Sequence, residues 1–499
     1  MARYLIGIDN GGTMSKAAVF SSDGRELAAA GRNVEIISKH SGWSERDMEA
    51  MWRGTVEAIR EAVAVAGISA EDIAGIACTG HGNGLYLIDA DGRPVRNAIN
   101  SMDSRASAIA EAWNAKGLDA QLLPKITQKI WAAQPAVLLT WLREHEPESI
   151  RKSAAVLMAK DYIRFRLTGK IAMEITDMSG AGIMNVITGE YDDSVLEAFG
   201  IPEMRRLLPP LVQSADVCGM ITPEVAGLTG LKVGTPVAGG MFDIDACSLA
   251  SGSLTEGQFV MVAGTWANNQ YVSPKPLVDK DIFITSRYCV PGNFLMFEGS
   301  PTGAGNLEWF AEEFLCEKKI QLGGPLLKWA DEEVAKIEPT EDAPLFLPFL
   351  YGSNVGAGYK ACFLGIEKRH TRADLMRAVY EGCAFSHQYH LKRLCQFTPV
   401  PEVVRLTGGA AKSRVWMQIF ADVFQIPVEI PEGSELGALG AAIAAAVASG
   451  VHDSYEGAVK AMVRTARRQE PDGSRAAVYA ARYGKYLAAV GALKSFFIK

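Results

Sequence analysis

Short apolar runs alternate with glycine-rich turns along the first 100 residues, which is typical of an α/β protein. The stretch LIGIDNGGTMSKAAVF at 5–20 holds two apolar runs around Asn-Gly-Gly-Thr. Asn-Gly between apolar runs predicts a β-hairpin, because both residues tolerate positive φ. A helix is predicted at 45–66, then a buried strand, IAGIACTG, that ends at HGNG, and a further strand, GLYLIDADG. Glycine-rich strand ends mark the sheet edge where α/β proteins usually bind ligands.

The pattern returns in the second half of the chain. Residues 105–210 are predicted to be mostly helical, and VGTPVAGGMFDIDACSLASG then indicates a strand, a turn and a small-residue helix. GQFVMVAGTWANNQYVS repeats the strand-turn-strand pattern about 250 residues after the first hairpin, which indicates two similar halves. The Ala- and Gly-rich segment 437–451 predicts a helix packed closely on a sheet. The tail after residue 455 is predicted to form surface helices.

Composition excludes several classes of protein. A chain of 499 residues is too long for one ordinary core, so we expect two domains. The net charge of -7, without any Lys/Arg run, argues against nucleic acid and acidic membranes as partners. The eight cysteines form no Cys-x-x-Cys pair, and the N-terminus runs directly into a predicted strand, so we expect a cytoplasmic protein without a signal peptide or membrane span.

The first predicted hairpin carries an acid that a plain turn does not need. Asp9 ends an apolar strand, and Asn10, Gly11, Gly12 and Thr13 follow it. Backbone N–H groups and a hydroxyl at such a tip can bind phosphate, the carboxylate can hold Mg²⁺, and Lys16 can add a positive charge. The alternative is a tight turn with an exposed Asp. The second hairpin, with Gly264 and Thr265 at its tip, favours two turns that hold the β- and γ-phosphates of a nucleotide.

Two acids compete for a catalytic role after the Gly-Gly strand end. Asp243 follows Gly239-Gly240 and opens a predicted helix, where it can be a general base for phosphoryl transfer or a simple N-cap. Asp245 lies two residues into the same helix, where an acid favours the helix dipole. Spacing alone does not choose between them.

Three further segments are candidates for ligand binding. Gly408, Gly409 and Ala410 between a strand and a helix allow a nucleotide to lie against backbone, although close packing explains them equally well. A polyol can be bound by the loop with Asp103 and Arg105, for which a surface ion pair is the alternative. His81 ends a strand, and a lone histidine there is more often structural. Triad-hydrolase, zinc-protease and P-loop motifs are all absent from the sequence.

The residues together resemble the FGGY carbohydrate kinases of the actin-like ATPase superfamily over about 4–450. The most specific stretch is ACFLGIEKRHTRADLMRAVYEG at 361–382, which fits the second family signature. The first signature resembles PAVLLTWLREH, with Leu138 where a Lys is usual. The resemblance implies two actin-like (ribonuclease H-like) α/β domains, 1–250 and 251–499, around a central cleft that holds ATP and sugar.

The same resemblance implies roles for individual residues. Asp9, Gly11, Gly12, Thr13 and Lys16 are similar to the first phosphate motif, in which the Thr is shifted by one position, and Asp9 would hold Mg²⁺. The second phosphate motif would be Gly264 and Thr265, and the adenosine motif Gly408, Gly409 and Ala410. The resemblance favours Asp243 over Asp245 as the catalytic base. His81-Gly82, Asp103 and Arg105 would bind the sugar, although Ser101 stands where the family usually has Trp.

The resemblance implies an ATP-dependent sugar kinase and allows a homodimer. SGWSERDM, WLREHEPE, VAGTWA and SPTGAGNLEWF are most similar to the branch that phosphorylates L-xylulose. We therefore expect transfer to the terminal hydroxyl of a ketopentose, L-xylulose first, which would give L-xylulose 5-phosphate. D-xylulose, erythritol and glycerol are the competing acceptors. An actin-like ATPase switch and a sugar-sensing pseudokinase are the non-enzyme alternatives.

Overall fold

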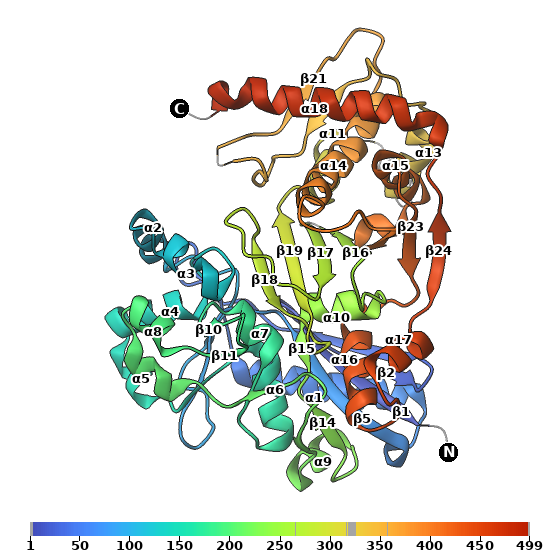
Figure 1. Cartoon of the computed structure of the whole chain (residues 1–499). Helices are drawn as coiled ribbons and strands as arrows, with labels where there is room; N and C mark the ends of the chain where they lie inside the picture. The colour runs from blue at the N-terminus through green and yellow to red at the C-terminus, as the bar shows by residue number, and fades with distance from the viewer. Residues whose placement is uncertain (1–2, 265, 316, 318–325, 357, 498–499) are drawn as a thin grey trace. The chain divides into compact units, whose positions relative to one another are not determined.

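The computed structural model describes residues 3–264, 266–315, 317, 326–356 and 358–497 (Figure 1). Contacts divide the chain into two compact units, each built from several segments. The first unit comprises Met1–Leu254, Val272–Met296 and Gly433–Val463. The second comprises Thr255–Tyr271, Phe297–Glu432 and Arg464–Lys499. The α/β class predicted from the sequence is confirmed, with a large mixed sheet for each half of the chain.

The first unit is organised around a sheet with the order β13-β14-β5-β1-β2-β3, in which β15 also pairs with β5. The predicted hairpin is formed by β1 and β2, and β5 runs parallel to β1. The strands are β1 (Tyr4–Asn10), β2 (Met14–Ser21), β3 (Glu26–Asn33), β5 (Ile73–Gly80), β13 (Val217–Met220), β14 (Pro236–Ala238) and β15 (Met241–Phe242).

Successive residues of β1 face opposite layers of helices, as the period of two in a strand requires. Ile6 and Ile8 pack in the core shared with α1, whereas Leu5 packs in the core shared with α16 and α10. Gly7 belongs to the α16 face, where an added Cβ would lie 1.7 Å from the carbonyl oxygen of Ala438. The backbone of α16 therefore approaches β1 as closely as the predicted small-residue helix allows.

Helices pack against the two faces of this sheet (Figure 1). The longest, α1, has Asp47 as its N-cap and an αL glycine, Gly67, at its C-cap. The helices are α1 (Met48–Ala66), α2 (Ser107–Ala115), α3 (Leu118–Ile126), α4 (Pro135–His145), α5 (Pro147–Lys152), α6 (Ala159–Thr168), α7 (Ile175–Gly180), α8 (Asp193–Ala198), α9 (Pro223–Thr229), α10 (Asp243–Ala250), α16 (Leu436–Ala448) and α17 (Tyr455–Met462).

Short strand pairs join the loops of the first unit. They are β4 (Glu45–Arg46) with β7 (Ala98–Ile99), β6 (Tyr86–Ile88) with β8 (Ala155–Leu157), β9 (Met173–Glu174) with β12 (Leu211–Val212), and β10 (Met184–Asn185) with β11 (Glu190–Tyr191). The segment Val272–Met296 adds β18 (Ile284–Arg287).

The sheet of the second unit has the strand order β19-β17-β16-β22-β23-β24. The second predicted hairpin is confirmed as β16 with β17. The strands are β16 (Gln258–Ala263), β17 (Ala267–Ser273), β19 (Phe294–Ser300), β20 (Leu345–Leu347), β21 (Cys362–Leu364), β22 (Val403–Thr407), β23 (Val428–Pro431) and β24 (Thr465–Gln469). The helices are α11 (Gly305–Phe314), α13 (Leu326–Val334), α14 (Arg372–Leu394), α15 (Arg414–Phe424) and α18 (Ala476–Phe497).

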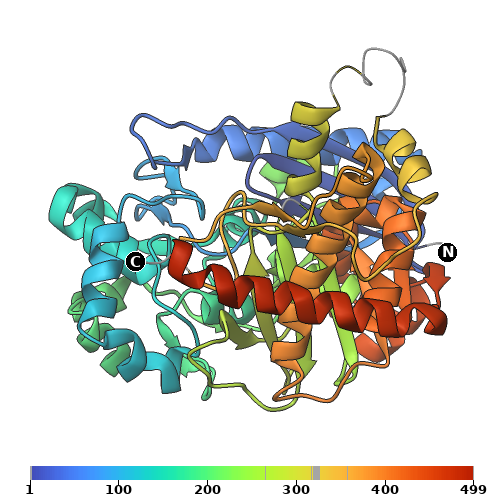
Figure 2. The same ribbon diagram turned by 90° about the horizontal axis from the view of Figure 1, so that it is seen from above.

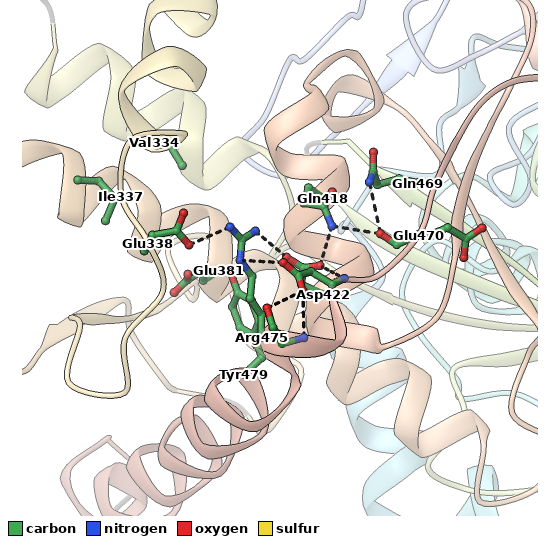
Figure 3. Close-up of polar contacts among 12 residues, drawn as sticks. Val334, Ile337, Glu338, Glu381, Gln418, Asp422, Gln469, Glu470, Arg475 and Tyr479 are labelled. Atoms are coloured by element: carbon green, nitrogen blue, oxygen red, sulfur yellow. Dashed lines mark hydrogen bonds and ion pairs between the residues drawn. The ribbon is translucent and has the colours of Figure 1, made fainter.

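The C-terminal helix α18 lies along the outside of the second unit, across α14 (Figures 1 and 2). A polar cluster fastens its start to α15. Arg475 lies between Asp422 at 3.2 Å and Glu338 at 2.8 Å, and Gln418 donates to Asp422 at 2.6 Å (Figure 3). Asp422 is fully buried, so these donors are needed to compensate its lost hydration.

Two predictions of secondary structure are corrected. The segment 45–66 is not helical throughout, because Glu45 and Arg46 form β4 and the helix begins only after Asp47. The tail after residue 455 is not all helix, because Thr465–Gln469 forms β24. This segment is polar and has no hydrophobic pattern that predicts a strand. It forms one because it makes antiparallel hydrogen bonds with β23.

Candidate functional site

Three neighbouring parallel strands of the first unit end together, and their ends carry three of the predicted residues. Asp9 in β1 is level with Thr79 in β5, and Thr79 is level with Met241 in β15. His81 follows β5, and Asp243 follows β15 as the first residue of α10. Because adjacent strands lie about 4.8 Å apart, the two acids are on the order of 10 Å apart across the β5 end.

Asp9 is surrounded by charge and by backbone. Its antiparallel partner in β2 is Lys16, whose Nζ donates to Glu435 Oε2 at 2.9 Å. Gly437, in the first turn of α16, lies so close that an added Cβ would stand 2.6 Å from Asp9 Oδ2. Burial raises the pKa of Asp9 to about 6, while Lys16 opposes that rise and Glu435 adds to it. The carboxylate is therefore held in a confined place that favours a cation as its neighbour.

The turn after Asp9 is held from one side by two donors. Arg46 Nη1 donates to the carbonyl of Gly11 at 3.0 Å, and Asn100 Nδ2 donates to the carbonyl of Gly12 at 3.1 Å. In a trans peptide the N–H points away from the carbonyl of the same unit. The N–H groups of Gly12 and Thr13 therefore point away from Arg46 and Asn100, toward the side where a phosphate can be bound.

The structure distinguishes the environments of Asp243 and Asp245. Asp245 is fully buried and accepts the backbone N–H of Cys289 at 3.1 Å, which is a structural contact. Asp243 is partly exposed, and its pKa is raised by burial and then by the nearby charges of Asp9 and Asp177. Burial raises the pKa of Asp245 as well, so exposure and not proton affinity separates the two acids, and the role of Asp243 as a base stays a prediction.

Asp243 owes its position to the two preceding glycines. Gly240 has φ +79, and an added Cβ there would stand 2.0 Å from the carbonyl oxygen of Cys78 in β5. At Gly239 it would stand 2.2 Å from the carbonyl oxygen of Gln213. Only glycine permits this approach, which places the start of α10 directly against the end of β5.

His81 is buried at the end of β5 and shares a hydrogen bond of 2.9 Å between its Nε2 and the hydroxyl of Tyr86. Burial and, after it, the positive charge of Arg46 lower its pKa to about 3. The next residue, Gly82, leaves room for two side chains, because an added Cβ would stand 2.4 Å from the Phe242 ring and 2.9 Å from Asp177 Oδ1. His81 is thus a neutral hydrogen-bonding group at the end of β5, next to the segment that leads into Asp243.

The lowered pKa of His81 predicts a pH dependence of stability. Between about pH 3 and the ordinary value of 6.5, the unfolded chain binds the proton that the folded chain refuses, so stability falls as the pH falls through this window. In the wild type, His81 should make the free energy of unfolding about 2 kcal/mol lower at pH 5 than at pH 8. In the His81→Gln variant this contribution should be absent. Urea unfolding at both pH values measures it, with the exposed His40→Gln as the matched histidine control. An unchanged pH dependence would contradict a buried neutral His81.

Asp103 and Arg105 are joined to one another in the structure. Arg105 donates from Nε to Asp103 Oδ1 and from Nη2 to Asp103 Oδ2, both at 2.9 Å, and also to Glu45 at 2.8 Å. The guanidinium lies 3.9 Å from the ring of Trp43, and the side chains of the Asp103–Arg105 pair have no exposed area. Arg105 Nη1 is buried without a hydrogen-bond partner. Direct sugar binding by this pair stays a prediction, and the contacts by themselves support a rigid loop.

The glycine turns of the second unit also come together. Gly408 has φ +86, and an added Cβ would stand 2.8 Å from the carbonyl oxygen of Ala263 and 3.0 Å from the N of Gly264. Gly409 and Ala410 begin a short 3-10 helix before α15. The ends of β16 and β22 thus form one backbone surface against which a flat group can lie. Thr265, predicted for the second phosphate motif, lies outside the described residues.

Several residues at these sites were missed by the sequence reasoning. The turn at Gly303 packs on Gly264, whose carbonyl accepts the N–H of Ala304 at 2.6 Å. Arg46, Asn100 and Asp177 each lie in a short polar segment with no periodicity, and only the tertiary fold brings them to the strand ends. A glycine-rich turn before a helix, TGAGN, was the one available signal.

Neither a metal cluster nor a membrane helix is found in the part of the chain that the structure describes. Its histidines, cysteines and acids form no group of three that could hold a metal ion. Within the same residues, no helix is both long and apolar enough to cross a bilayer. A single carboxylate such as Asp9 still suits Mg²⁺, which keeps several waters and binds through one or two carboxylates together with substrate phosphates.

Comparison with known proteins gives matches over the whole chain. Residues 4–250 match the N-terminal domain, and residues 259–449 the C-terminal domain, of the FGGY family of carbohydrate kinases. The chain is 36% identical to a probable L-xylulose kinase of Pasteurella multocida, covering 99% of both chains. It is 38% identical to the L-xylulose/3-keto-L-gulonate kinase of Escherichia coli, covering 99% of this chain and 98% of that one. A crystal structure of xylulose kinase from Rhodospirillum rubrum matches with a TM-score of 0.91 at 27% identity, covering 100% of both chains.

Proposed function

The chain belongs to the FGGY family of carbohydrate kinases and is an ATP-dependent sugar kinase, and we propose that it transfers phosphate to the terminal hydroxyl of L-xylulose. The observation that carries the choice of sugar is the 36% and 38% identity to relatives named L-xylulose kinases over 99% of this chain. Those matches span nearly the whole chain and so include the segments that carry the strand ends of both units. The product would be L-xylulose 5-phosphate.

Asp243 is proposed as the general base. Its carboxylate would take the proton of the O5 hydroxyl while O5 attacks the γ-phosphorus of ATP. The new O5–P bond forms as the bond between the γ-phosphorus and the β-γ bridging oxygen breaks, and ADP leaves with that oxygen. The raised pKa of Asp243 and its position at the strand ends support this role. His81, neutral and 2.9 Å from the Tyr86 hydroxyl, would hydrogen-bond a neighbouring sugar hydroxyl.

The phosphate-binding roles are proposed for both units. In the first unit, the outward-pointing N–H groups of Gly12 and Thr13 would bind phosphate oxygens, and Lys16 would exchange Glu435 for a phosphate. In the second unit, Gly264 would bind phosphate, and Gly408, Gly409 and Ala410 would support the adenosine. Asp9 would hold Mg²⁺, which neutralises charge on the transferred group when bound. Asp103 and Arg105 would fix the sugar loop or bind the sugar directly.

Asp9→Asn tests the metal role. The variant keeps the shape of the side chain but removes the charge that attracts a divalent cation. We expect kcat to fall at least about 100-fold, a loss of about 2.7 kcal/mol, and the Mg²⁺ concentration for half-maximal rate to rise. Steady-state kinetics at varied Mg²⁺ measures both.

Glu435→Gln is the matched control for Asp9→Asn, since it removes a neighbouring acid that contacts Lys16. It should leave the Mg²⁺ requirement nearly unchanged. An Asp9 variant with wild-type Mg²⁺ dependence would remove Asp9 from the metal site.

The substrate proposal is tested by a panel of acceptors. The values of kcat/KM for L-xylulose, D-xylulose, L-ribulose, erythritol and glycerol are compared side by side, and the product is identified by ³¹P NMR. A site that hydrogen-bonds successive hydroxyls rejects an analogue that leaves its groups unpaired by up to ~10⁴-fold. L-xylulose should therefore lead the panel. If glycerol or erythritol is better, the choice of sugar is wrong, and if ATP hydrolysis occurs without any acceptor, the protein is an ATPase switch.

A further inference from the structure

A cluster of fully buried charges joins α6 to the start of α7 in the first unit. It contains two cations and three acids, each with 0% exposure: Lys160, Asp161, Arg164, Glu174 and Asp177. Lys160 Nζ lies 2.8 Å from Asp161 Oδ2 and 3.4 Å from Glu174 Oε2. Arg164 Nη1 lies 2.7 Å from Asp161 Oδ1. Burying charges costs free energy that their pairing only partly returns, so stability alone does not explain this cluster.

Glu174, the N-cap of α7, accepts hydrogen bonds from two hydroxyl groups. Thr176 Oγ1 donates to its Oε2 and Ser214 Oγ donates to its Oε1, each at 2.7 Å. A hydroxyl has one hydrogen to donate, and in both residues it is directed at the carboxylate. The oxygen of Thr176 is therefore fixed in orientation and can accept a further hydrogen bond on its other side.

The peptide unit between Met241 and Phe242 is held on both of its sides. The N–H of Phe242 donates to Thr176 Oγ1 at 2.9 Å. The carbonyl of Met241 accepts the hydroxyl of Thr79, in β5, also at 2.9 Å. In a trans peptide these two groups point in opposite directions, so the two threonines hold the planar unit from opposite sides. The next residue along the chain is Asp243, whose approach is thereby fixed.

The two glycines before this peptide are held as well. The carbonyl of Gly239 accepts Arg164 Nη1 at 2.6 Å, and the N–H of Gly240 donates to the carbonyl of Ser214 at 3.0 Å. Arg164 and Ser214 each contact an acid of the buried cluster. The backbone of 239–242, which leads into α10, is therefore connected to the cluster at three successive points.

We propose that Thr79 and Thr176 are positioning residues for the general base Asp243. Glu174 orients the hydroxyl of Thr176, and the two threonines, both fully buried, act through one peptide unit and not on the sugar. The inference rests on the proposed function, in which Asp243 takes the proton of the acceptor hydroxyl. A base must lie within hydrogen-bond reach of that proton, and a displacement of about 1 Å can lower the rate about 100-fold.

Thr176→Val is the first test, because valine has nearly the shape of threonine and lacks the hydroxyl. The N–H of Phe242 would lose its partner, so kcat for L-xylulose should fall about 30-fold while both KM values stay within about 3-fold. Thr176→Ser should recover most of kcat, because serine keeps the hydroxyl. A coupled assay for ADP on the full chain measures each value.

Thr79→Val tests the opposite side of the same peptide and decides the question if Thr176→Val fails to fold. Valine is well suited to the interior of a strand, so β5 should form normally. Loss of the hydroxyl that holds the carbonyl of Met241 should lower kcat about 10-fold, again with KM nearly unchanged.

Thr229→Val is the matched control in the same unit. Thr229 is buried, and its hydroxyl also donates one hydrogen bond, to the carbonyl of Val225 at 2.7 Å, and accepts another, from the N–H of Leu231 at 3.2 Å. Neither bond involves the segment before Asp243. This variant should lose stability in urea unfolding and retain wild-type kcat.

The inference is overturned if both Thr176→Val and Thr79→Val keep more than about half of wild-type kcat, or if Thr229→Val lowers kcat by the same factor. A loss that appears in KM alone also contradicts it, because the threonines would then affect binding and not the base. A wild type that prefers another acceptor changes only the proposed sugar, and the same comparison is made with that acceptor. If no acceptor is phosphorylated, the proposed function itself has failed.

Discussion

Asp243→Asn is expected to abolish phosphoryl transfer while sugar and ATP still bind. Asn has the shape of Asp but cannot accept the hydroxyl proton, so the loss should appear in kcat and leave both dissociation constants within a few-fold of the wild type. General base catalysis contributes 10²–10⁴-fold, so we expect kcat to fall on the order of 10³-fold. A coupled assay for ADP gives kcat, and calorimetric titration gives the two affinities.

Asp245→Asn is the matched control, two residues further along α10. Asp245 Oδ1 accepts the N–H of Cys289, and an Asn side-chain oxygen can keep that contact. This variant should retain most of its kcat. If Asp243→Asn keeps more than about a tenth of wild-type kcat, a loss below ~1.4 kcal/mol, Asp243 is not the base.

Gly7→Ala is expected to cause the largest loss of stability from a single methyl group. The new Cβ would stand 1.7 Å from the carbonyl oxygen of Ala438, so α16 or β1 must move by more than an ångström. The atoms that the new Cβ would meet are main-chain atoms of Ala438 in a packed core, where overpacking costs about 3 kcal/mol. Urea unfolding should show that decrease. Because Asp9 is two residues along the same strand, kcat should fall as well.

Gly491→Ala is the control for the glycine substitution itself. Gly491 lies in α18 with nothing within 4 Å of an added Cβ. Alanine should stabilise this helix by about 0.5–1 kcal/mol, the opposite sign to Gly7→Ala. If the two variants lose the same stability, the close approach of α16 to β1 is not what the glycine provides.

Local patterns were sufficient to predict the elements that carry the phosphate turns. The first hairpin has two apolar runs around a tight turn, and its turn geometry fixes the register. The second has an apolar run, a Gly-Thr pair and the more polar run ANNQYVS, which pairs with the first run as β17. The helix at 437–451 was predicted to pack on a sheet, and its small residues do so at β1 and β5. The polar strands β4 and β24 were missed, because they are stabilised by pairing with β7 and β23 and not by a residue pattern of their own.

The candidate site was only partly visible to the sequence. Glycines near a polar side chain at a strand end are a short-range signal, and they selected Asp9, His81 and Asp243, which the structure brings to neighbouring strand ends. Asp243 and Asp245 could not be separated by spacing, whereas the contact of Asp245 with Cys289 distinguishes them.

The sequence by itself determined the α/β class, the family, and the strand-end acids, because each depends on residues that are neighbours along the chain. Only the tertiary structure decided which distant groups surround them. Glu435 meets Lys16 across 419 residues, and Arg46 meets the carbonyl of Gly11 across 35. The burial of Arg46 depends on elements far apart along the chain, which no local pattern encodes, because burial is known only when the whole shell around a side chain is known.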